Sequence, residues 1–271
     1  MSAGRLERAL LARRDAGGKC LVPYVTAGIT GRWPEHVTAA EDGGADAIEI
    51  GLPFSDPMLD GPIIQEASAR ALGRGVTVAG LLAELAGVRA TVPLIVMTYS
   101  NIVRRHGYDG FCRRLAGAGV SGLIVADTPV DEVGPPLAAA SGAGLELVML
   151  VAPSTKPERV ARIGAASRGF VYAVSTMGVT GVRDTVSDSV AATVRRVRAC
   201  TRLPVLVGFG ISNPEQAAAV ARVADGVVVA SALMRSVLAG ATPADTRREV
   251  AALRAAVDSA ATGSGAGSAT G

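Results

Sequence analysis

The fold is decided by one stretch of the chain, which reads VLVGFGISNPE from Val205 to Glu215. It opens with a continuous apolar run, a pattern typical of a strand buried on both faces of a parallel sheet. Glycines then mark a tight turn, and Ser212-Asn213-Pro214-Glu215 is a capping box that predicts the start of a helix. The stretch is therefore one strand-to-helix unit.

The same unit recurs along the chain. Eight apolar runs predict strands: Leu21–Thr26, Ala47–Ile50, Leu94–Tyr99, Leu123–Ala126, Leu145–Val151, Phe170–Ser175, Val205–Phe209 and Gly226–Ala230. Segments rich in Ala, Arg and Glu predict amphipathic helices between them: His36–Gly43, Ala79–Ala90, Gly110–Ala118, Glu158–Ala165, Val190–Cys200 and Pro214–Val223. Eight units in about 230 residues predict the fold class α/β with a single (β/α)8 TIM barrel. An open doubly wound sheet is a weaker alternative, because no G-x-G-x-x-G motif follows the first run.

One barrel domain is thus expected at residues 1–258, although 271 residues alone would also allow two small domains. Residues 259–271 contain only Ser, Ala, Thr and Gly, which is typical of a disordered tail. Two strand-to-helix connections are long, from Gly51 to about Gln65 and from Ser175 to about Asp188. Because barrel sites form at the carboxyl ends of the strands, both loops are expected to contribute to a site.

Composition argues against several classes of protein. The 27 Lys and Arg against 24 Asp and Glu leave a net charge of +3 without a basic stripe, so no nucleic-acid partner is expected. No apolar run reaches the ~18 residues of a membrane span, and no signal peptide is recognised, so no membrane association is expected. Cys20, Cys112 and Cys200 lie far apart, which argues against a zinc site or disulfides and favours a cytoplasmic protein.

The first long loop carries the best candidates for catalysis. It reads EIGLPFSDPMLDGP from Glu49 to Pro62. Glu49 lies near the end of an apolar strand, where burial in the barrel mouth would raise the pKa of its carboxyl group. Asp60 lies in a loop stiffened by prolines, and Asp56 is a third candidate. Two carboxyl groups in different environments allow one to shuttle protons while the other stays ionised. A purely structural role, closing a turn or capping a strand, is the alternative for each.

This pair predicts proton-transfer chemistry without a cofactor. His36 lies in an expected helix and His106 beyond the third run, so neither belongs to a spaced metal motif and no metal site is expected. The two lysines, Lys19 and Lys156, are expected to be solvated, which disfavours a Schiff-base mechanism.

Turns rich in small residues follow the last three predicted strands, at Gly178–Gly181, Gly208–Ser212 and Val229–Ala232. In (β/α)8 barrels a phosphate is often bound by the loops after strands 7 and 8 and by a helix N-terminus. Gly210 allows a close backbone approach, and Ser231 adds a hydroxyl donor at a helix start. These turns predict a phosphorylated substrate.

At Glu49–Pro57 and Asp60–Gln65 the sequence resembles the signature of the tryptophan synthase alpha chain family. Further matches extend over about residues 5 to 255, at Leu21–Gly28, Tyr99–Asn101, Ala126–Pro129, Gly178–Gly181 and Gly208–Ser212. The family is a (β/α)8 barrel that splits indole-3-glycerol phosphate into indole and glyceraldehyde 3-phosphate. It usually passes indole to a pyridoxal-phosphate beta subunit, so the resemblance implies that substrate and a beta-subunit partner in an alpha2beta2 complex.

The resemblance also implies residue roles. The glutamate matching Glu49 is the general acid/base, which protonates indole C3 and takes the glycerol hydroxyl proton. The aspartate matching Asp60 accepts the indole N–H and stabilises positive charge in the ring. Tyr24, Tyr99, Tyr172 and Thr180 fall at substrate-pocket or loop positions, and Tyr172 fits a buried core aromatic equally. Phosphate contacts fall on Gly181, Phe209, Gly210, Ala230 and Ser231, and a partner interface falls on Asp56, Asn101 and Pro129.

Some residues depart from the family pattern, and these departures bear on whether the chain works with a beta subunit. Thr176 and Met177 stand where an arginine commonly precedes the glycine, Ala230 replaces a usual glycine, and Arg104 and Arg105 make the third loop more basic. Standalone indole-glycerol-phosphate lyases keep both carboxyl groups, so that alternative stays open. Two others are a non-catalytic allosteric barrel subunit and a different phosphosugar isomerase or epimerase.

Overall fold

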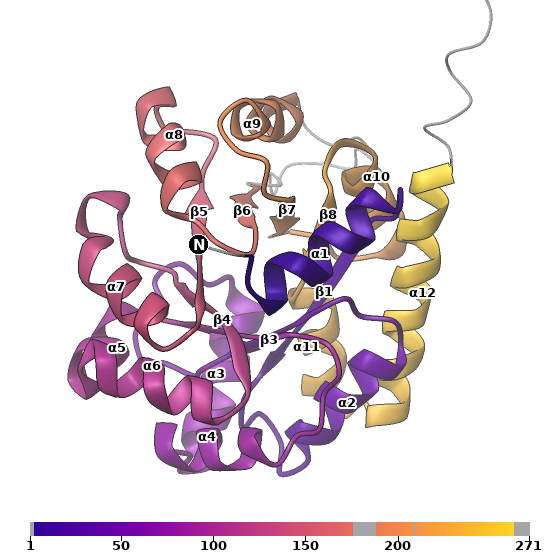
Figure 1. The fold of residues 1–271 in the computed structure, drawn as a ribbon. Coiled ribbons are helices and arrows are strands. Elements are labelled where there is room, and N and C mark those ends of the chain that lie inside the picture. Colours follow the sequence, from indigo (N-terminus) through magenta and orange to yellow (C-terminus); the bar gives the residue numbers. More distant parts are fainter. Residues whose placement is uncertain (1–2, 176–187, 209, 263–271) are drawn as a thin grey trace, which may run out of the picture.

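The computed structural model describes residues 3–175, 188–208 and 210–262. Eight parallel strands form a closed barrel in chain order, with β1 paired to both β2 and β8 (Figure 1). The strands are β1 (Cys20–Thr26), β2 (Ile48–Gly51), β3 (Leu94–Thr98), β4 (Val120–Val125), β5 (Glu146–Val151), β6 (Val171–Val174), β7 (Val205–Gly208) and β8 (Gly226–Val229). The predicted single (β/α)8 barrel is confirmed.

Every apolar run that predicts a strand coincides with one, and only the ends differ. The largest difference is at β4, which begins at Val120 and not at the predicted Leu123. The prediction begins too late because Ser121 and Gly122 interrupt the apolar run. Gly122 is required by packing, since a Cβ there would lie 2.7 Å from a methyl group of Leu6. All eight strands are buried almost throughout, as expected for a parallel sheet covered on both faces.

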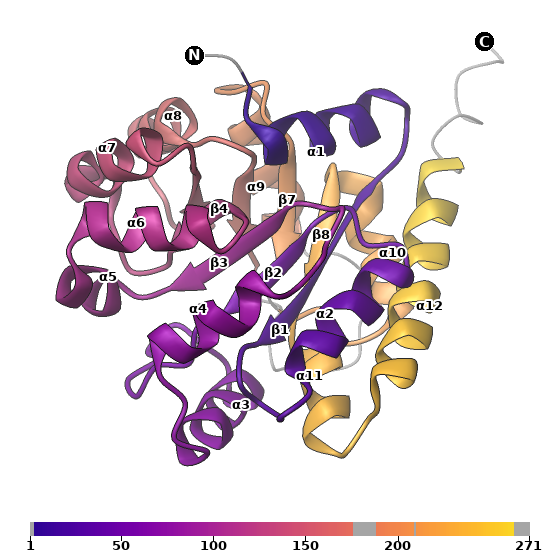
Figure 2. The ribbon, with the colours of Figure 1, turned by 60° about the horizontal axis from the view of Figure 1, so that its bottom comes forward.

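Helices surround the barrel (Figures 1 and 2). They are α1 (Arg5–Asp15), α2 (Trp33–Asp42), α3 (Pro62–Gly73), α4 (Val78–Ala86), α5 (Ser100–His106), α6 (Tyr108–Gly117), the 3-10 turn η1 (Val130–Glu132), α7 (Gly134–Gly142), α8 (Pro157–Ala166), α9 (Asp188–Arg198), α10 (Pro214–Val223), α11 (Ser231–Leu238) and α12 (Pro243–Thr262). The six predicted helices are all present. Within the described ranges, no helix has an apolar stretch suited to crossing a bilayer.

The cap of α10 differs from the sequence prediction by one residue. Asn213, not Ser212, is the N-cap, and its side chain accepts a hydrogen bond from the Gln216 N–H at 2.8 Å. The Gln216 carboxamide in turn accepts from the Ser212 N–H at 2.9 Å. One of the two capping-box bonds is therefore present, from Asn213 to the third residue of the helix, whereas the return bond from Gln216 reaches Ser212, one residue before the cap.

Helix α1 lies across the amino-terminal end of the barrel (Figure 1), in contact with β1 and β4. The N–H groups of Leu6 and Glu7 in its first turn donate to the carboxylate of Glu146 at 2.7 and 2.9 Å. Leu6 itself is fully buried. Since this end is covered, the carboxyl ends of the strands are left to form the site.

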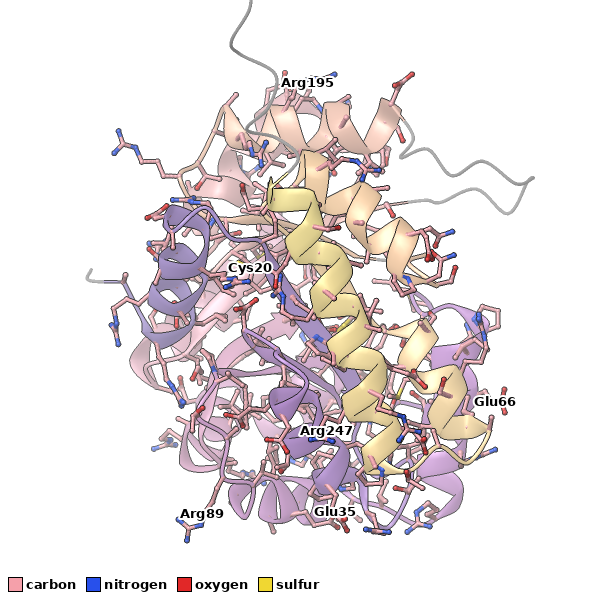
Figure 3. All side chains as sticks on the ribbon, turned by 90° about the vertical axis from the view of Figure 1, so that its right-hand side faces the viewer. Cys20, Glu35, Glu66, Arg89, Arg195 and Arg247 are labelled. Carbon is pink, nitrogen blue, oxygen red and sulfur yellow. The ribbon has the colours of Figure 1, made fainter. Side chains whose placement is uncertain are left out.

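Helix α12 packs beside α2 and α10 (Figure 3). It continues to Thr262, four residues past the domain end predicted at residue 258, so residues 259–262 are helical. Ala260 is buried in the core. Alanine is the best helix former, which explains why this Ala-containing end of the predicted tail is helical. Residues 263–271 lie outside the described residues.

Candidate active site

Glu49 is a carboxyl group in the middle of an apolar strand. It lies in β2 between Ile48 and Ile50, in register with Tyr24 of β1, and is 1% exposed. Its Oε2 atom has no hydrogen-bond partner among the described residues. Burial, followed by the charge of Asp60, raises the pKa of Glu49 to about 8. The group is therefore mainly protonated at neutral pH and able to donate its proton.

Asp60 lies in the loop between β2 and α3. Two bonds close this loop locally: the Asp60 N–H donates to the Pro57 carbonyl at 3.0 Å, and the side-chain Nε2 of Gln65 donates to the Asp60 carbonyl at 2.9 Å. Burial raises the pKa of Asp60 to about 6, against the effect of a hydrogen bond from Tyr99, which lowers it. Asp60 is thus mainly ionised at neutral pH, where Glu49 is mainly protonated.

The predicted substrate-pocket tyrosines are buried in the same region. Tyr24 of β1, Tyr99 after β3 and Tyr172 of β6 are all at most 5% exposed. Burial is the main cause that raises the pKa of each phenol. The charge of Asp60 raises the pKa of Tyr24 and Tyr99 further, and the charges of Glu49 and then Asp60 raise that of Tyr172. Three tyrosines and two carboxyl groups therefore meet at one end of the barrel.

Glycines make room for two of these rings. A Cβ at Gly51 would overlap the hydroxyl of Tyr24, and a Cβ at Gly208 would overlap the hydroxyl of Tyr172. Both glycines end their strands. The Tyr24 ring of β1 therefore lies over the end of β2, and the Tyr172 ring of β6 lies over the end of β7. Sequence reasoning interprets Gly208 as part of a phosphate turn and does not detect this steric role.

We expect Gly51→Ala to destabilise the fold by about 1–3 kcal/mol, because the buried Tyr24 ring must shift to admit the methyl group. Denaturant unfolding measures the change. Gly73→Ala is the matched control, because nothing lies within 4 Å of a Cβ at the end of α3. It should be neutral or slightly stabilising. Equal stability of the wild type and Gly51→Ala would contradict the prediction.

The predicted phosphate site is described only in part. Gly210 has a positive φ of 80° and is exposed, and Ile211 beside it is buried. Ala230 is the N-cap residue of α11, and its side chain cannot accept a hydrogen bond. No N-cap side chain therefore competes with a ligand for the first N–H groups of this helix. Ser231 begins the helix. Thr180, Gly181 and Phe209 lie outside the described residues, so these assignments stay predictions.

The predicted partner residues follow three successive strands. Asp56 is exposed after β2 and accepts a hydrogen bond from the Ser55 hydroxyl at 2.6 Å; Asn101 is exposed on α5 after β3, and Pro129 is exposed after β4. Sequence reasoning missed Met58 and Leu59, which are 75% and 44% exposed. Two adjacent exposed apolar side chains are a signal of an interaction surface, and their position between two aspartates in this loop could have indicated it.

A cavity of about 570 Å³ lies near the carboxyl ends of β4 and β5, and neither Glu49 nor Asp60 lines it. It is lined by residues 126–130 after β4, by Met149 and Leu150 of β5, and by residues at the start of α8. Leu150 is in register with Tyr172, so the cavity lies next to the barrel mouth. Pro129 is the one predicted site residue that lines it.

Other chemistry-bearing groups lie away from the site. His36 is buried and its Nδ1 is 2.8 Å from the Thr246 hydroxyl. Lys156 is exposed as expected, whereas the expectation that Lys19 is solvated is wrong. Lys19 is half-buried at the amino end of β1 and donates to the Ala224 carbonyl at 2.9 Å. In the described part of the chain, no cluster of three or more His, Cys, Asp or Glu side chains could hold a metal ion.

Comparison with known proteins identifies the family. Residues 11–262 match the family model described as tryptophan synthase alpha chain. The tryptophan synthase alpha chain of Halorhodospira halophila is 44% identical over 270 residues, which cover 96% of this chain and 98% of that protein. That of Gloeobacter violaceus is 45% identical over 262 residues, which cover 92% of each.

Solved structures agree. A chain of Mycobacterium tuberculosis tryptophan synthase superposes with a TM-score of 0.87 at 42% identity, covering 95% of this chain and 99% of that one. The alpha subunit from Legionella pneumophila superposes with a TM-score of 0.86 at 32% identity, covering 95% and 100%. With its barrel, its paired carboxyl groups and these relatives, the chain belongs to the tryptophan synthase alpha chain family.

Proposed function

We propose that Glu49 and Asp60 are the catalytic pair with which this chain cleaves indole-3-glycerol phosphate to indole and glyceraldehyde 3-phosphate. Membership of the family makes the chain a carbon–carbon lyase of tryptophan biosynthesis. The observation that supports the residue roles is the pair itself, two carboxyl groups close enough to influence each other but with pKa values of about 8 and about 6. One is suited to give a proton and the other to remain charged.

The reaction is balanced by one proton that Glu49 gives and recovers. The protonated carboxyl group of Glu49 donates to C3 of the indole ring, which leaves positive charge on the ring nitrogen. The Asp60 carboxylate accepts a hydrogen bond from that N–H and stabilises the charge. The Glu49 carboxylate then takes the proton of the glycerol hydroxyl next to the ring. As the carbon–carbon bond breaks, its electrons return to the ring and the former alcohol becomes an aldehyde.

The phosphate of the substrate is assigned to the end of the barrel near β7 and β8. The N–H groups of Gly210, Ala230 and Ser231 are the described donors, and the Ser231 hydroxyl adds another. A helix N-terminus without a side-chain cap favours an anion through both its free N–H groups and its dipole. Binding then rests on oriented backbone dipoles and needs no lysine.

We assign the exposed face formed by Asp56, Met58, Leu59, Asn101 and Pro129 to a beta subunit that receives indole. The exposed Met58 and Leu59 side chains favour a partner, because apolar side chains at a protein surface gain from being covered. The alternative, a standalone lyase, is favoured by Arg104 and Arg105, because these exposed residues of α5 make the third loop more basic than the family pattern. All three cysteines are free thiols, which supports a reducing cytoplasm.

The test supplies purified chain with indole-3-glycerol phosphate, with and without the cognate beta subunit. Equal amounts of indole and glyceraldehyde 3-phosphate are expected in both cases, with faster release when the beta subunit is present. Unchanged rates, together with no co-elution of the two chains, would favour the standalone lyase. Beta-subunit stimulation by a chain that releases no indole even in the complex would support the non-catalytic subunit and overturn the proposed chemistry.

A further inference from the structure

Tyr99 joins the loop that carries Asp60 to the neighbouring strand. It follows β3 directly and is the N-cap residue of α5, and its side chain is 3% exposed. Its ring stacks on Phe54 of the β2–α3 loop, with the ring centroids 5.1 Å apart and the planes at 28°. The first half of that loop is thus packed against the end of β3.

The hydroxyl of the same residue holds the second half of the loop. It accepts a hydrogen bond from the Leu59 N–H at 3.2 Å, and its interaction with the neighbouring Asp60 carboxylate lowers the pKa of that group. The nearby backbone bonds of this half are local, from the Met58 N–H to the Asp56 carbonyl at 2.9 Å and from the Asp60 N–H to the Pro57 carbonyl at 3.0 Å. Tyr99 therefore connects a locally folded turn to the barrel.

Tyr99 is itself held firmly. The N–H and hydroxyl of Ser100, the next residue, both donate to the carboxylate of Asp127, each at 2.7 Å. Asp127 lies just after β4, so the start of α5 is fixed between two strands of the barrel. Because its backbone is fixed in this way, Tyr99 can hold the loop residues that it contacts in one orientation.

We propose that Tyr99 is a positioning residue, whose ring and hydroxyl hold the β2–α3 loop so that the Asp60 carboxylate is aimed at the barrel mouth. The inference rests on the proposed function, which makes Asp60 the group that stabilises charge. It assigns to Tyr99 a role distinct from contact with the substrate.

The hydroxyl also affects the charge of Asp60. The titratable groups that face this carboxylate are Glu49 on β2, Tyr24 on β1, Tyr172 on β6 and Tyr99 itself. Burial raises the pKa of Asp60, and the hydrogen bond from Tyr99 lowers it. Removing the hydroxyl therefore raises the pKa further, so more of the carboxylate is protonated in mildly acidic solution.

The test is Tyr99→Phe, which keeps the ring and removes the hydroxyl that accepts from the Leu59 N–H and lowers the pKa of Asp60. In carbon-13 NMR titrations without substrate, assigned with Asp60→Asn, the pKa of Asp60 is expected to rise by about 1 unit. The Leu59 amide should exchange with deuterium about tenfold faster, because it loses its acceptor. The acidic limb of kcat/KM should move with the carboxyl group, giving a loss of about tenfold at pH 5 and less than about twofold at pH 8.

Tyr108→Phe is the matched control, since it removes a phenol hydroxyl that contacts Arg104 on the helices outside the barrel mouth. It should leave the Asp60 titration, the Leu59 exchange and the pH profile unchanged. If folded Tyr99→Phe also leaves the Asp60 titration and the Leu59 exchange at wild-type values, the proposal is overturned. Both NMR measurements need no turnover, so they decide the role of Tyr99 even if the wild type released no indole.

Discussion

A Glu49→Gln variant will release indole from indole-3-glycerol phosphate about 10²–10⁴-fold more slowly than the wild type, the cost of losing a general acid/base. Glutamine has nearly the same shape, so the buried position in β2 stays filled, but it can neither give nor take the proton. The effect should fall on kcat rather than on KM, because substrate contacts are kept. Steady-state indole release measures both.

Glu66→Gln on α3 is the control for this substitution. Glu66 is exposed, and its nearest charged partner, Arg70, lies 3.9 Å away. The change from glutamate to glutamine is the same, but the side chain faces solvent, so kcat should stay within about twofold of the wild type, as a surface carboxyl group takes no part in proton transfer. A Glu49→Gln variant that also retained kcat to within tenfold would show that Glu49 is not the acid/base.

Glu49→Gln lowers activity, but it should make the stability of the fold less sensitive to a rise in pH. The pKa of Glu49 is raised from its usual 4.5 to about 8 in the folded chain. Its protonation therefore favours the folded state fully below about pH 4.5, and this contribution is lost as the pH rises through about 8. Glutamine stays neutral, so the free energy of unfolding of Glu49→Gln should fall less between pH 5 and pH 8 than that of the wild type.

Asp60→Asn is expected to lower kcat by about 10²–10³-fold, the usual effect of removing one preorganised group that stabilises transition-state charge. The wild-type rate should also fall below about pH 6, where the Asp60 carboxylate becomes protonated. Asparagine is neutral at every pH, so the residual activity of the variant should lack this acidic limb. Rates of indole release from pH 5 to pH 9 provide the measurement.

Asp42→Asn at the exposed end of α2 makes the same chemical change away from the barrel mouth and should keep the wild-type profile. The assignment of Asp60 would fail if Asp60→Asn kept both the wild-type rate and its acidic limb. Loss of activity with unchanged KM would place the role of Asp60 in the transition state rather than in binding.

The barrel was predictable because its signal is local. Each strand is a short apolar run, and the run at Val205–Gly208 also carries its turn and helix start. The catalytic candidates were predictable for the same reason, since a glutamate between Ile48 and Ile50 is out of place in a buried strand unless it has a function. Both inferences need only a few adjacent residues.

The contacts that tune the site were not predictable, because they join distant residues. Leu59 and Tyr99 are 40 positions apart, and nothing in either stretch indicates that a phenol would accept the Leu59 N–H. The fit of Gly51 to Tyr24 likewise depends on how two strands meet in the closed barrel. Half-burial of Lys19 follows from its contact with Ala224, 205 positions away.

Helix α1 has a consequence for the order in which the chain is assembled during synthesis. It leaves the ribosome before any strand of the barrel, yet the Glu146 carboxylate that accepts from its leading N–H groups is separated from Leu6 by 140 positions. The strand that completes the ring beside β1 comes later still, because Cys20 pairs with Gly226. Helix α1 can therefore cover the amino-terminal end of the barrel only after Glu146 has been synthesised, and β1 can close the ring only after Gly226. Until then the apolar residues of the nascent α1 segment lack their native partners.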